Sequence, residues 1–234
     1  PKAIVHLDRL ARNYKILSNS INGKRLMAVV KANAYGHGAI ECSKKLEDQG
    51  CDFFSVFTVE EAEELRNAGL KSDILILSKL EKESIQTAID NDLIVNISSI
   101  DDLDSIIIYL EKNGLSPRFH MKIETGMNRL GFDLSDISLS IGKLLDYKNL
   151  NCEGIYTHYA TSDEGDLSYA HLQRERFEQA LEIANEMGYT FKYKHISNSG
   201  GLLNDLSSNT NMLRLGILLY GIYQSKDVEK KYVL

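Results

Sequence analysis

Short apolar runs recur along the whole chain, and amphipathic stretches separate them. The runs are rich in valine, isoleucine and aromatic residues and lack a strict alternation of polar and apolar positions. Such runs are typical of strands that are buried on both faces of a parallel sheet. We predict strands at Leu26–Val30, Phe53–Phe57, Asp73–Leu77, Leu93–Ile97, Arg118–Ile123, Cys152–His158, Phe191–Ile196 and Met212–Ile217.

The stretches between these runs carry helix signals. Thr58 followed by Glu61 has the pattern of a capping box, and Ser99 followed by Asp102 predicts the start of a second helix. The longest helix is predicted from about Leu167 to Met187.

Eight such alternations predict an α/β fold, a single (β/α)8 TIM barrel over residues 1–234. The main alternative is an open doubly wound sheet. That fold would carry a phosphate loop such as Gly-x-Gly-x-x-Gly, and the sequence has none.

Composition narrows the class of protein. The chain is 43% hydrophobic and 26% charged, with a formal charge of −6 and no basic cluster, so no nucleic-acid partner is expected. No apolar run approaches the roughly 20 residues of a membrane-spanning helix. Cys42, Cys51 and Cys152 are scattered and form no Cys-x-x-Cys pair, which favours a reducing compartment and disfavours a structural metal site. We therefore expect a cytoplasmic protein without a metal.

In a (β/α)8 barrel, chemistry gathers where the strands end. Lys31 follows the first run, Arg129 lies in the loop after the fifth, His158 ends the sixth, and Arg214 lies in the eighth. These side chains should meet at one rim. Burial at a strand end lowers the pKa of a lysine and frees its amine for Schiff-base chemistry, although Lys31 could also simply extend into solvent.

Each candidate also has an ordinary structural interpretation. Arg129 could be a surface charge, His158 a hydrogen-bonded structural histidine, and Asn198 with Ser199 the cap of a helix. Arg214 lies between two leucines and demands a partner if it is buried. The acidic run 162–166 lacks the spacing of a calcium loop, so we interpret it as a solvated loop.

The loops after strands seven and eight favour an anion site. They contain Ser199-Gly200-Gly201 and Gly216-Ile217, which offer a hydroxyl and exposed backbone N–H groups. Phosphates commonly bind at this position in barrel enzymes. A cofactor anchored there would extend towards Lys31, an arrangement that suits an aldehyde with a phosphate tail.

Five segments in order resemble the alanine racemase family, over almost the whole chain. They are Val-Val-Lys-Ala-Asn-Ala-Tyr-Gly-His-Gly (29–38), Glu-Thr-Gly-Met-Asn-Arg-Leu-Gly (124–131), Thr-His-Tyr-Ala (157–160), His-Ile-Ser-Asn-Ser (195–199) and Arg-Leu-Gly-Ile-Leu-Leu-Tyr-Gly (214–221). The resemblance implies a barrel that binds pyridoxal 5'-phosphate. It also implies an isomerase that interconverts L- and D-alanine and supplies D-alanine for the bacterial cell wall.

The resemblance also implies a role for each site residue. Lys31 would bind the cofactor covalently and act as one of two acid/base groups at the substrate α-carbon. The phosphate would be held by Tyr35, Ser199, Gly216 and Ile217, with Asn198 beside them. Arg214 would contact the pyridine nitrogen, and His158 would lie by the ring and hydrogen-bond towards Arg214. Arg129 would reach the phenolic oxygen, and Lys122 matches a position that is often carbamylated.

The sequence departs from the family pattern in three ways. Asn128 stands where glycine is frequent, and Glu124 where aspartate is frequent. Family members also carry a C-terminal β-rich domain, from which a tyrosine of the partner subunit serves as the second base. We find no such domain here. We therefore expect this chain to be a fragment of a longer homodimeric enzyme, able to bind the cofactor and poor at racemising alone.

Three alternatives remain. One is a serine racemase of the same architecture, attached to a membrane segment in the full protein. Another is a non-catalytic, single-barrel carrier of pyridoxal phosphate. The third is a barrel without a cofactor that serves as an interaction module.

Overall fold

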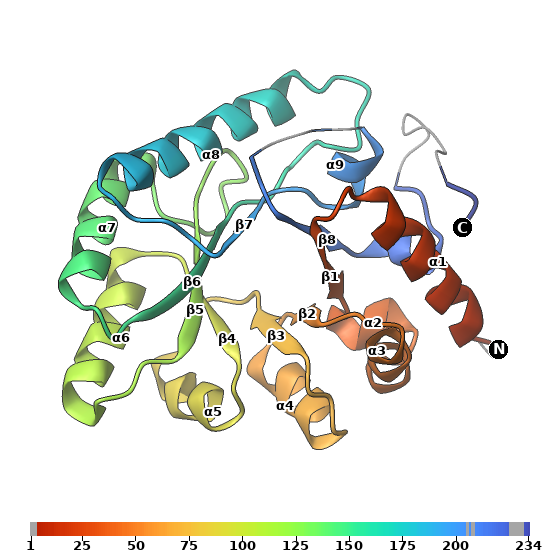
Figure 1. Ribbon diagram of the computed structural model, residues 1–234, viewed down its shortest axis with the longest axis horizontal. Coiled ribbons are helices and arrows are strands. Elements are labelled where there is room, and N and C mark those ends of the chain that lie inside the picture. Colours follow the sequence, from red (N-terminus) through yellow and green to blue (C-terminus); the bar gives the residue numbers. More distant parts are fainter. Residues whose placement is uncertain (1–3, 205, 207–208, 225–231) are drawn as a thin grey trace.

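The computed structural model of the protein describes residues 4–204, 206, 209–224 and 232–234. Parallel strands alternate with helices (Figure 1). The strands are β1 (Arg25–Val29), β2 (Phe53–Val56), β3 (Asp73–Ile76), β4 (Ile94–Ile97), β5 (Arg118–Lys122), β6 (Asn151–Tyr156), β7 (Tyr193–His195) and β8 (Met212–Leu215). The helices are α1 (Leu7–Ser20), α2 (Lys31–Gly36), α3 (Ala39–Asp48), α4 (Val59–Asn67), α5 (Ile85–Asp90), α6 (Ile100–Asn113), α7 (Ile137–Asp146), α8 (Ser168–Glu186) and α9 (Ser199–Leu203), with 3-10 turns η1 (Lys82–Ser84), η2 (Leu134–Asp136) and η3 (Ile217–Tyr220).

The strands close into a barrel in sequence order, and β1 pairs in parallel with β8. Each predicted strand lies within two residues of the observed one. The (β/α)8 prediction is therefore confirmed. The open sheet is excluded, because its first and last strands would be unpaired edges.

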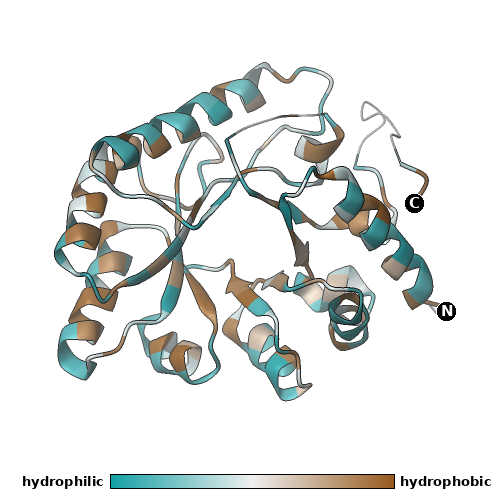
Figure 2. Ribbon diagram, in the orientation of Figure 1, coloured by the Kyte–Doolittle hydropathy of each residue, from teal (hydrophilic) through white to brown (hydrophobic). Residues whose placement is uncertain are grey.

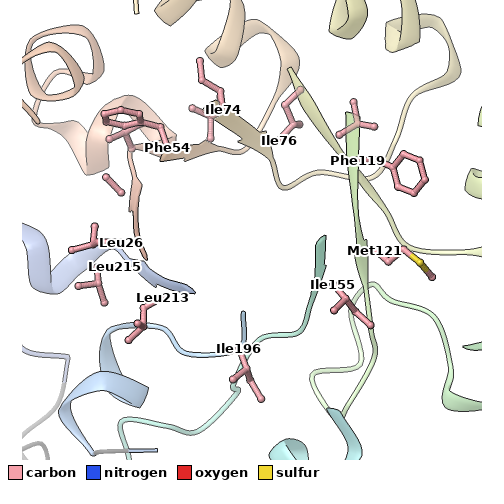
Figure 3. Packing of buried hydrophobic residues seen from close by; sticks show 14 of the residues in the cluster. Leu26, Phe54, Ile74, Ile76, Phe119, Met121, Ile155, Ile196, Leu213 and Leu215 are labelled. Carbon is pink, nitrogen blue, oxygen red and sulfur yellow. The ribbon is translucent and has the colours of Figure 1, made fainter. Parts of the chain in front are cut away.

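Alternate residues of each strand face opposite sides of the barrel wall and divide the apolar core in two. The outer cluster lies between strands and helices, and Figure 3 shows Leu26, Phe54 and Phe119 pointing away from the barrel interior. The inner cluster fills the barrel with Met27, Phe53, Leu75, Ile94, Tyr193 and Met212. Because both faces are covered, the strands are predominantly hydrophobic, whereas each long helix also carries hydrophilic residues (Figure 2).

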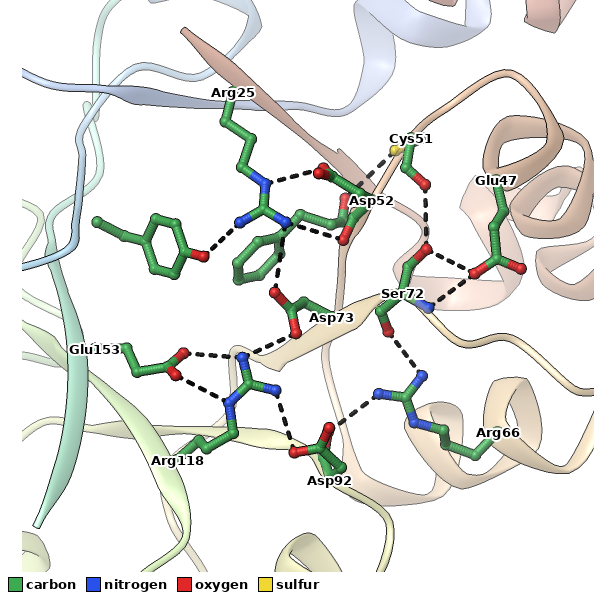
Figure 4. Close-up of polar contacts among 12 residues, drawn as sticks. Arg25, Glu47, Cys51, Asp52, Arg66, Ser72, Asp73, Asp92, Arg118 and Glu153 are labelled. Atoms are coloured by element: carbon green, nitrogen blue, oxygen red, sulfur yellow. Dashed lines mark hydrogen bonds and ion pairs between the residues drawn. The ribbon is translucent and has the colours of Figure 1, made fainter. Parts of the chain in front are cut away.

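Charged side chains close the amino-terminal end of the barrel (Figure 4). Arg118 forms ion pairs with Asp73 at 2.8 Å and with Glu153 at 2.9 Å. Arg25 lies 2.9 Å from Asp52 and 3.5 Å from Asp73. Arg25, Asp73 and Arg118 begin the alternate strands β1, β3 and β5, so their opposite charges meet inside the barrel, directly below the inner apolar cluster.

The predicted helix caps are present. Thr58 and Glu61 form a capping box at the start of α4, and the Ser99 side chain accepts a hydrogen bond from the Asp102 backbone at the start of α6. Helix α8 matches its predicted bounds to within one residue. No helix in the described ranges is both long and apolar enough to cross a bilayer.

Candidate active site

A cavity of about 550 Å³ lies at the carboxyl ends of the strands. Small-molecule sites typically fall in this size range. Its lining includes every site residue predicted from the sequence: Lys31, Tyr35, Lys122, Arg129, His158, Asn198, Ser199, Arg214, Gly216 and Ile217. The expected convergence on one rim is therefore confirmed. Phe57, Leu77 and Tyr156 complete much of the wall.

Lys31 lies where β1 ends and the chain enters a left-handed helical turn. The next four residues, Ala32 to Tyr35, have φ between 51° and 54°. The left-handed region is unfavourable for residues with a Cβ, so the local sequence alone does not favour this turn. Burial, and then the charge of Arg129, lower the pKa of Lys31. More of the amine is therefore neutral at a given pH.

Tyr220 packs against this turn. Its hydroxyl donates to the Val29 carbonyl at 3.2 Å, and its ring stacks on His37 with 4.7 Å between centroids. The same ring meets Tyr35 edge-on at 5.4 Å. Segment 214–221, which contains Tyr220, thus packs on segment 29–38, and this contact holds Tyr35 over the cavity.

Tyr35, Ser199 and Gly216 form a small polar cradle. The Ser199 hydroxyl accepts hydrogen bonds from the backbone N–H groups of Gly216 at 3.3 Å and Leu218 at 3.4 Å. A Cβ on Gly216 would lie 2.5 Å from the Tyr35 hydroxyl. Only a glycine leaves that space open, and hydroxyl and N–H donors gathered in this way suit an anion.

Asn198 caps the helix beside the cradle, as its ordinary interpretation predicted. Its Oδ1 accepts from the Gly201 backbone at 2.9 Å and from the Ser162 hydroxyl at 2.6 Å. Ser162 is fully buried. The prediction of a solvated loop over 162–166 is therefore wrong at Ser162, because the serine completes the hydrogen bonding of the cap.

Arg214 is 4% exposed and has no carboxylate partner within the described chain. It donates to His195 Nδ1 at 2.6 Å, to His158 Nδ1 at 3.1 Å and to the Thr157 carbonyl at 2.7 Å. Burial lowers its pKa to about 10, so it keeps its charge at neutral pH. Burial and the Arg214 charge also hold the pKa of His158 well below its ordinary value. The expected bond between His158 and Arg214 is present.

Lys122 is also 4% exposed. Its Nζ lies 5.9 Å from the centre of the Tyr156 ring, and the Arg214 guanidinium lies 5.1 Å from the same ring. Burial, followed by the charges of Arg129 and Arg214, lowers the pKa of Lys122 to about 8. The Tyr156 ring near both cations partly offsets their desolvation.

The loop that carries Arg129 is organised by Glu124. The Glu124 carboxylate accepts hydrogen bonds from the backbone N–H groups of Gly126 and Arg129. Burial alone would raise the pKa of Glu124, but hydrogen bonds from Asn128 and its neighbours lower it overall. Asn128 has φ 52°, a conformation in which glycine is favoured and asparagine is well tolerated. Glu124 and Asn128, the two departures from the family pattern in this segment, therefore fit the loop.

The Arg129 side chain is exposed at the rim and forms no ion pair with the described residues. Its charge nevertheless affects the pKa of Lys31 and of Lys122. The geometry thus gives Arg129 a part in the cavity as well as a surface location.

Sequence reasoning missed several residues of this site. His195, Tyr156 and Tyr220 contact the predicted residues but were not selected. His195 and Tyr220 lie within the quoted segments, which was the available signal. Tyr156 precedes one of them and looks like an ordinary strand aromatic. Within the described ranges, no group of three or more histidine, cysteine or acidic side chains is arranged to hold a metal.

The fold and the cavity define a class of protein: a (β/α)8 barrel whose rim carries a lysine of lowered pKa, a buried arginine and a polar cradle. The family model described as "Alanine racemase, N-terminal domain" matches residues 5–224. The chain belongs to the alanine racemase N-terminal domain family.

Related proteins agree with this assignment. The chain is 38% identical to an alanine racemase of Methanococcus maripaludis, over 99% of this chain and 62% of that protein. It is 35% identical to an alanine racemase of Desulforamulus reducens, over 99% of this chain and 63% of that protein. The solved structure of alanine racemase from Clostridium difficile 630 superposes with a TM-score of 0.91 at 32% identity, covering 98% of this chain and 62% of that one. The chain thus spans about three fifths of the length of these relatives.

Proposed function

We propose that this chain is the pyridoxal-phosphate-binding barrel of an alanine racemase. The observation that carries the proposal is the meeting of Lys31, Arg214 and the Ser199–Gly216 cradle in one cavity. The barrel domain is proposed to extend over residues 1–234, although 1–3, 205, 207–208 and 225–231 lie outside the described residues. Membership of the family supports the proposal independently.

The cavity suits the chemical groups of pyridoxal phosphate. The space that a Cβ on Gly216 would fill, beside two hydroxyls, suits the phosphate. Arg214 is a buried cation whose hydrogen-bond partners are uncharged, so its charge is not neutralised by them and suits a ring nitrogen. Lys31, with its lowered pKa, suits the aldehyde. Arg129 is assigned to the phenolic oxygen, and Asn198 and Ile217 to the walls of the phosphate end.

Bound pyridoxal phosphate supplies an electron sink for the substrate α-carbon. The residues of the chain then have distinct tasks. Lys31 takes or returns a proton at the α-carbon, which its lowered pKa favours. Arg214 holds a permanent charge at the ring nitrogen and does not give up its proton. His158 fixes one Nη of Arg214 and packs beside the ring. Lys122, as its carbamate, would steady Arg129, because the carbamate carries a negative charge.

The proposed substrate is alanine, because the relatives are named alanine racemases; serine is the alternative. We further propose that the enzyme works as a cytoplasmic homodimer that supplies D-alanine for the cell wall. Racemisation needs proton transfer at both faces of the α-carbon, and Lys31 serves one face. The second group is assigned to the partner subunit, in line with the family resemblance.

The first test is cofactor capture. Purified chain is mixed with pyridoxal phosphate, reduced with borohydride and digested. We expect a stable mass increase on the peptide that contains Lys31 and none in Lys31→Ala. Lys45→Ala is the control, since Lys45 pairs with Asp8 on the outside of the barrel. Capture at surface lysines without preference for Lys31 would refute the cofactor site and favour the plain interaction module.

The second test separates an enzyme from a carrier. Loaded chain is incubated with L-alanine or D-alanine in deuterium oxide. A single proton-transfer group predicts exchange of the α-hydrogen of one enantiomer well before its configuration is lost, and no exchange with Lys31→Ala. Serine measured in parallel addresses the substrate. Loaded chain that exchanges neither amino acid would support the non-catalytic carrier instead.

A further inference from the structure

Glu61 links two loops at the cavity rim. Its Oε1 accepts a hydrogen bond from the Ala32 backbone N–H at 2.7 Å, and its Oε2 accepts one from the Phe57 N–H at 2.6 Å. Ala32 directly follows Lys31, and Phe57 directly follows β2. Both Lys31 and Phe57 line the cavity. One carboxylate therefore ties the exits of two adjacent strands together at the site.

This is more than a helix cap requires. A capping box needs Glu61 only to reach back to the Thr58 N–H, which here is 3.4 Å from Oε2. The two shorter bonds go outside α4. Ala32 is left-handed, with φ 51°, so its N–H begins a turn that the local sequence does not favour. Glu61 supplies a strong acceptor at that point.

The charge of Glu61 also matters for Lys31. The charges of Arg129 and Arg214 oppose protonation of Lys31, and Lys122 and His158 are further neighbours of the same amine. Glu61 is the carboxylate that acts in the opposite direction. Its hydrogen bond to the Ala32 N–H holds this charge next to the backbone that directly follows Lys31.

We propose that Glu61 is a positioning residue for Lys31, fixing the backbone that follows the lysine and balancing the cations around its amine. The inference rests on the proposed function, in which Lys31 is the reacting amine. It predicts that losing Glu61 changes Lys31 itself, beyond any loss of helix stability.

The test compares Glu61→Ala with Thr58→Ala in chain without cofactor. Each variant removes one half of the capping box and so weakens the start of α4 to a similar extent. Only Glu61→Ala removes the acceptor of Ala32 and Phe57. Two quantities are measured: amide hydrogen exchange at Ala32, and the pH dependence of reductive methylation at Lys31. Glu61→Gln is the third variant, since it keeps an acceptor oxygen and removes the charge.

With Glu61→Ala we expect Ala32 exchange to accelerate about tenfold and Lys31 methylation at pH 7 to accelerate about threefold, because the amine loses its balancing charge. Glu61→Gln should accelerate methylation, because it removes the charge, and should protect Ala32 only in part, because its single acceptor oxygen can serve Ala32 or Phe57 but not both. Thr58→Ala should leave both within about twofold of the parent. Equal effects of Thr58→Ala and Glu61→Ala, or no effect of either Glu61 variant on Lys31, would overturn the proposal. Neither readout uses pyridoxal phosphate, so failure of the proposed function would show separately, in the capture experiment.

Discussion

Arg214 donates a hydrogen bond to Nδ1 of His195 at 2.6 Å, and this contact sets the protonation of a buried histidine pair. A guanidinium is always a donor, so Nδ1 of His195 accepts and its proton lies on Nε2. That Nε2 then donates to Nδ1 of His120 at 3.0 Å, which leaves the His120 proton on a buried Nε2 without a described partner. Both rings are neutral in the fold.

This neutral pair predicts a pH-dependent stability. Burial, with help from the Arg118 and Arg214 charges, lowers the pKa of His120 to about 3, and burial also lowers the pKa of His195. Below about pH 6.5 the unfolded chain binds protons that the folded chain does not. The free energy of unfolding should therefore fall as the pH decreases from 6.5, by about 1.4 kcal/mol per pH unit for each such proton.

Urea unfolding between pH 7.5 and 4.5 measures this slope. In His120→Asn the asparagine Oδ1 can replace Nδ1 as the acceptor. The slope of the unfolding free energy against pH should then be shallower by the contribution of about one proton. The exposed His171 on α8 serves as the control, and His171→Gln should leave the slope unchanged. A slope that His120→Asn does not alter would show that this pair is not the source.

A second prediction concerns Gly216. In Gly216→Ala the new methyl group would lie 2.5 Å from the Tyr35 hydroxyl, so Tyr35 must leave the cradle. We expect the affinity for pyridoxal phosphate to fall by about tenfold or more, measured by absorbance titration. The double variant Gly216→Ala with Tyr35→Phe lacks the closest clashing atom. It should therefore weaken binding by less than the sum of the two single effects.

The matched control is Gly142→Ala in α7, where nothing lies within 4 Å of the added Cβ. This change should stabilise the helix by about 0.5–1 kcal/mol and leave binding unaltered. If Gly142→Ala and Gly216→Ala weakened binding equally, the cradle would not be the phosphate site.

Lys122 should react with carbon dioxide. With a pKa of about 8, a sizeable share of the amine is neutral near that pH. The neutral nitrogen bonds to the carbon of CO₂ and releases one proton, giving a carbamate. We expect a carbamate resonance in carbon-13 NMR spectra of chain equilibrated with labelled bicarbonate at pH 8.

Lys122→Met should abolish this resonance. Lys192→Met is the control, because Lys192 is exposed and its hydrogen bond with Tyr193 raises its pKa. A signal that persists in Lys122→Met would assign the carbamate to another amine, and the absence of any signal in the parent chain would count against the modification.

The left-handed turn predicts a stabilising substitution. Ala32 is exposed and has φ 51°, so Ala32→Gly relieves backbone strain of about 0.5–1 kcal/mol while keeping the N–H that Glu61 holds. In the right-handed helix α4 the same comparison reverses: Glu64→Gly should be about 1 kcal/mol less stable than Glu64→Ala. Thermal unfolding of these three variants and of the parent chain checks the sign. A destabilising Ala32→Gly would mean that the turn is not strained in solution.

The fold was predictable because buried parallel strands are short apolar runs, and their ends then located Lys31, Arg129 and Arg214. The left-handed turn was not, because tertiary contacts from Tyr220 and Glu61 stabilise a conformation that Ala32 to Tyr35 do not prefer. The pairing of His120 with His195 was also hidden, since β7 has only three residues, too few for their alternation to show which side chains point inward.

The charged residues at the amino-terminal end of the barrel restrict the access of solvent to the site. Arg25, Asp73 and Arg118 close the amino-terminal end, and Phe53 and Met27 plug the space above them. The hydrogen-bonded path from His158 through Arg214 and His195 therefore ends at His120, whose Nε2 has no described partner, and does not continue to solvent at the amino-terminal end. Under the proposed function, cofactor, amino acid and protons would enter at the rim cavity, because the described residues of the amino-terminal end close the opposite side of the barrel.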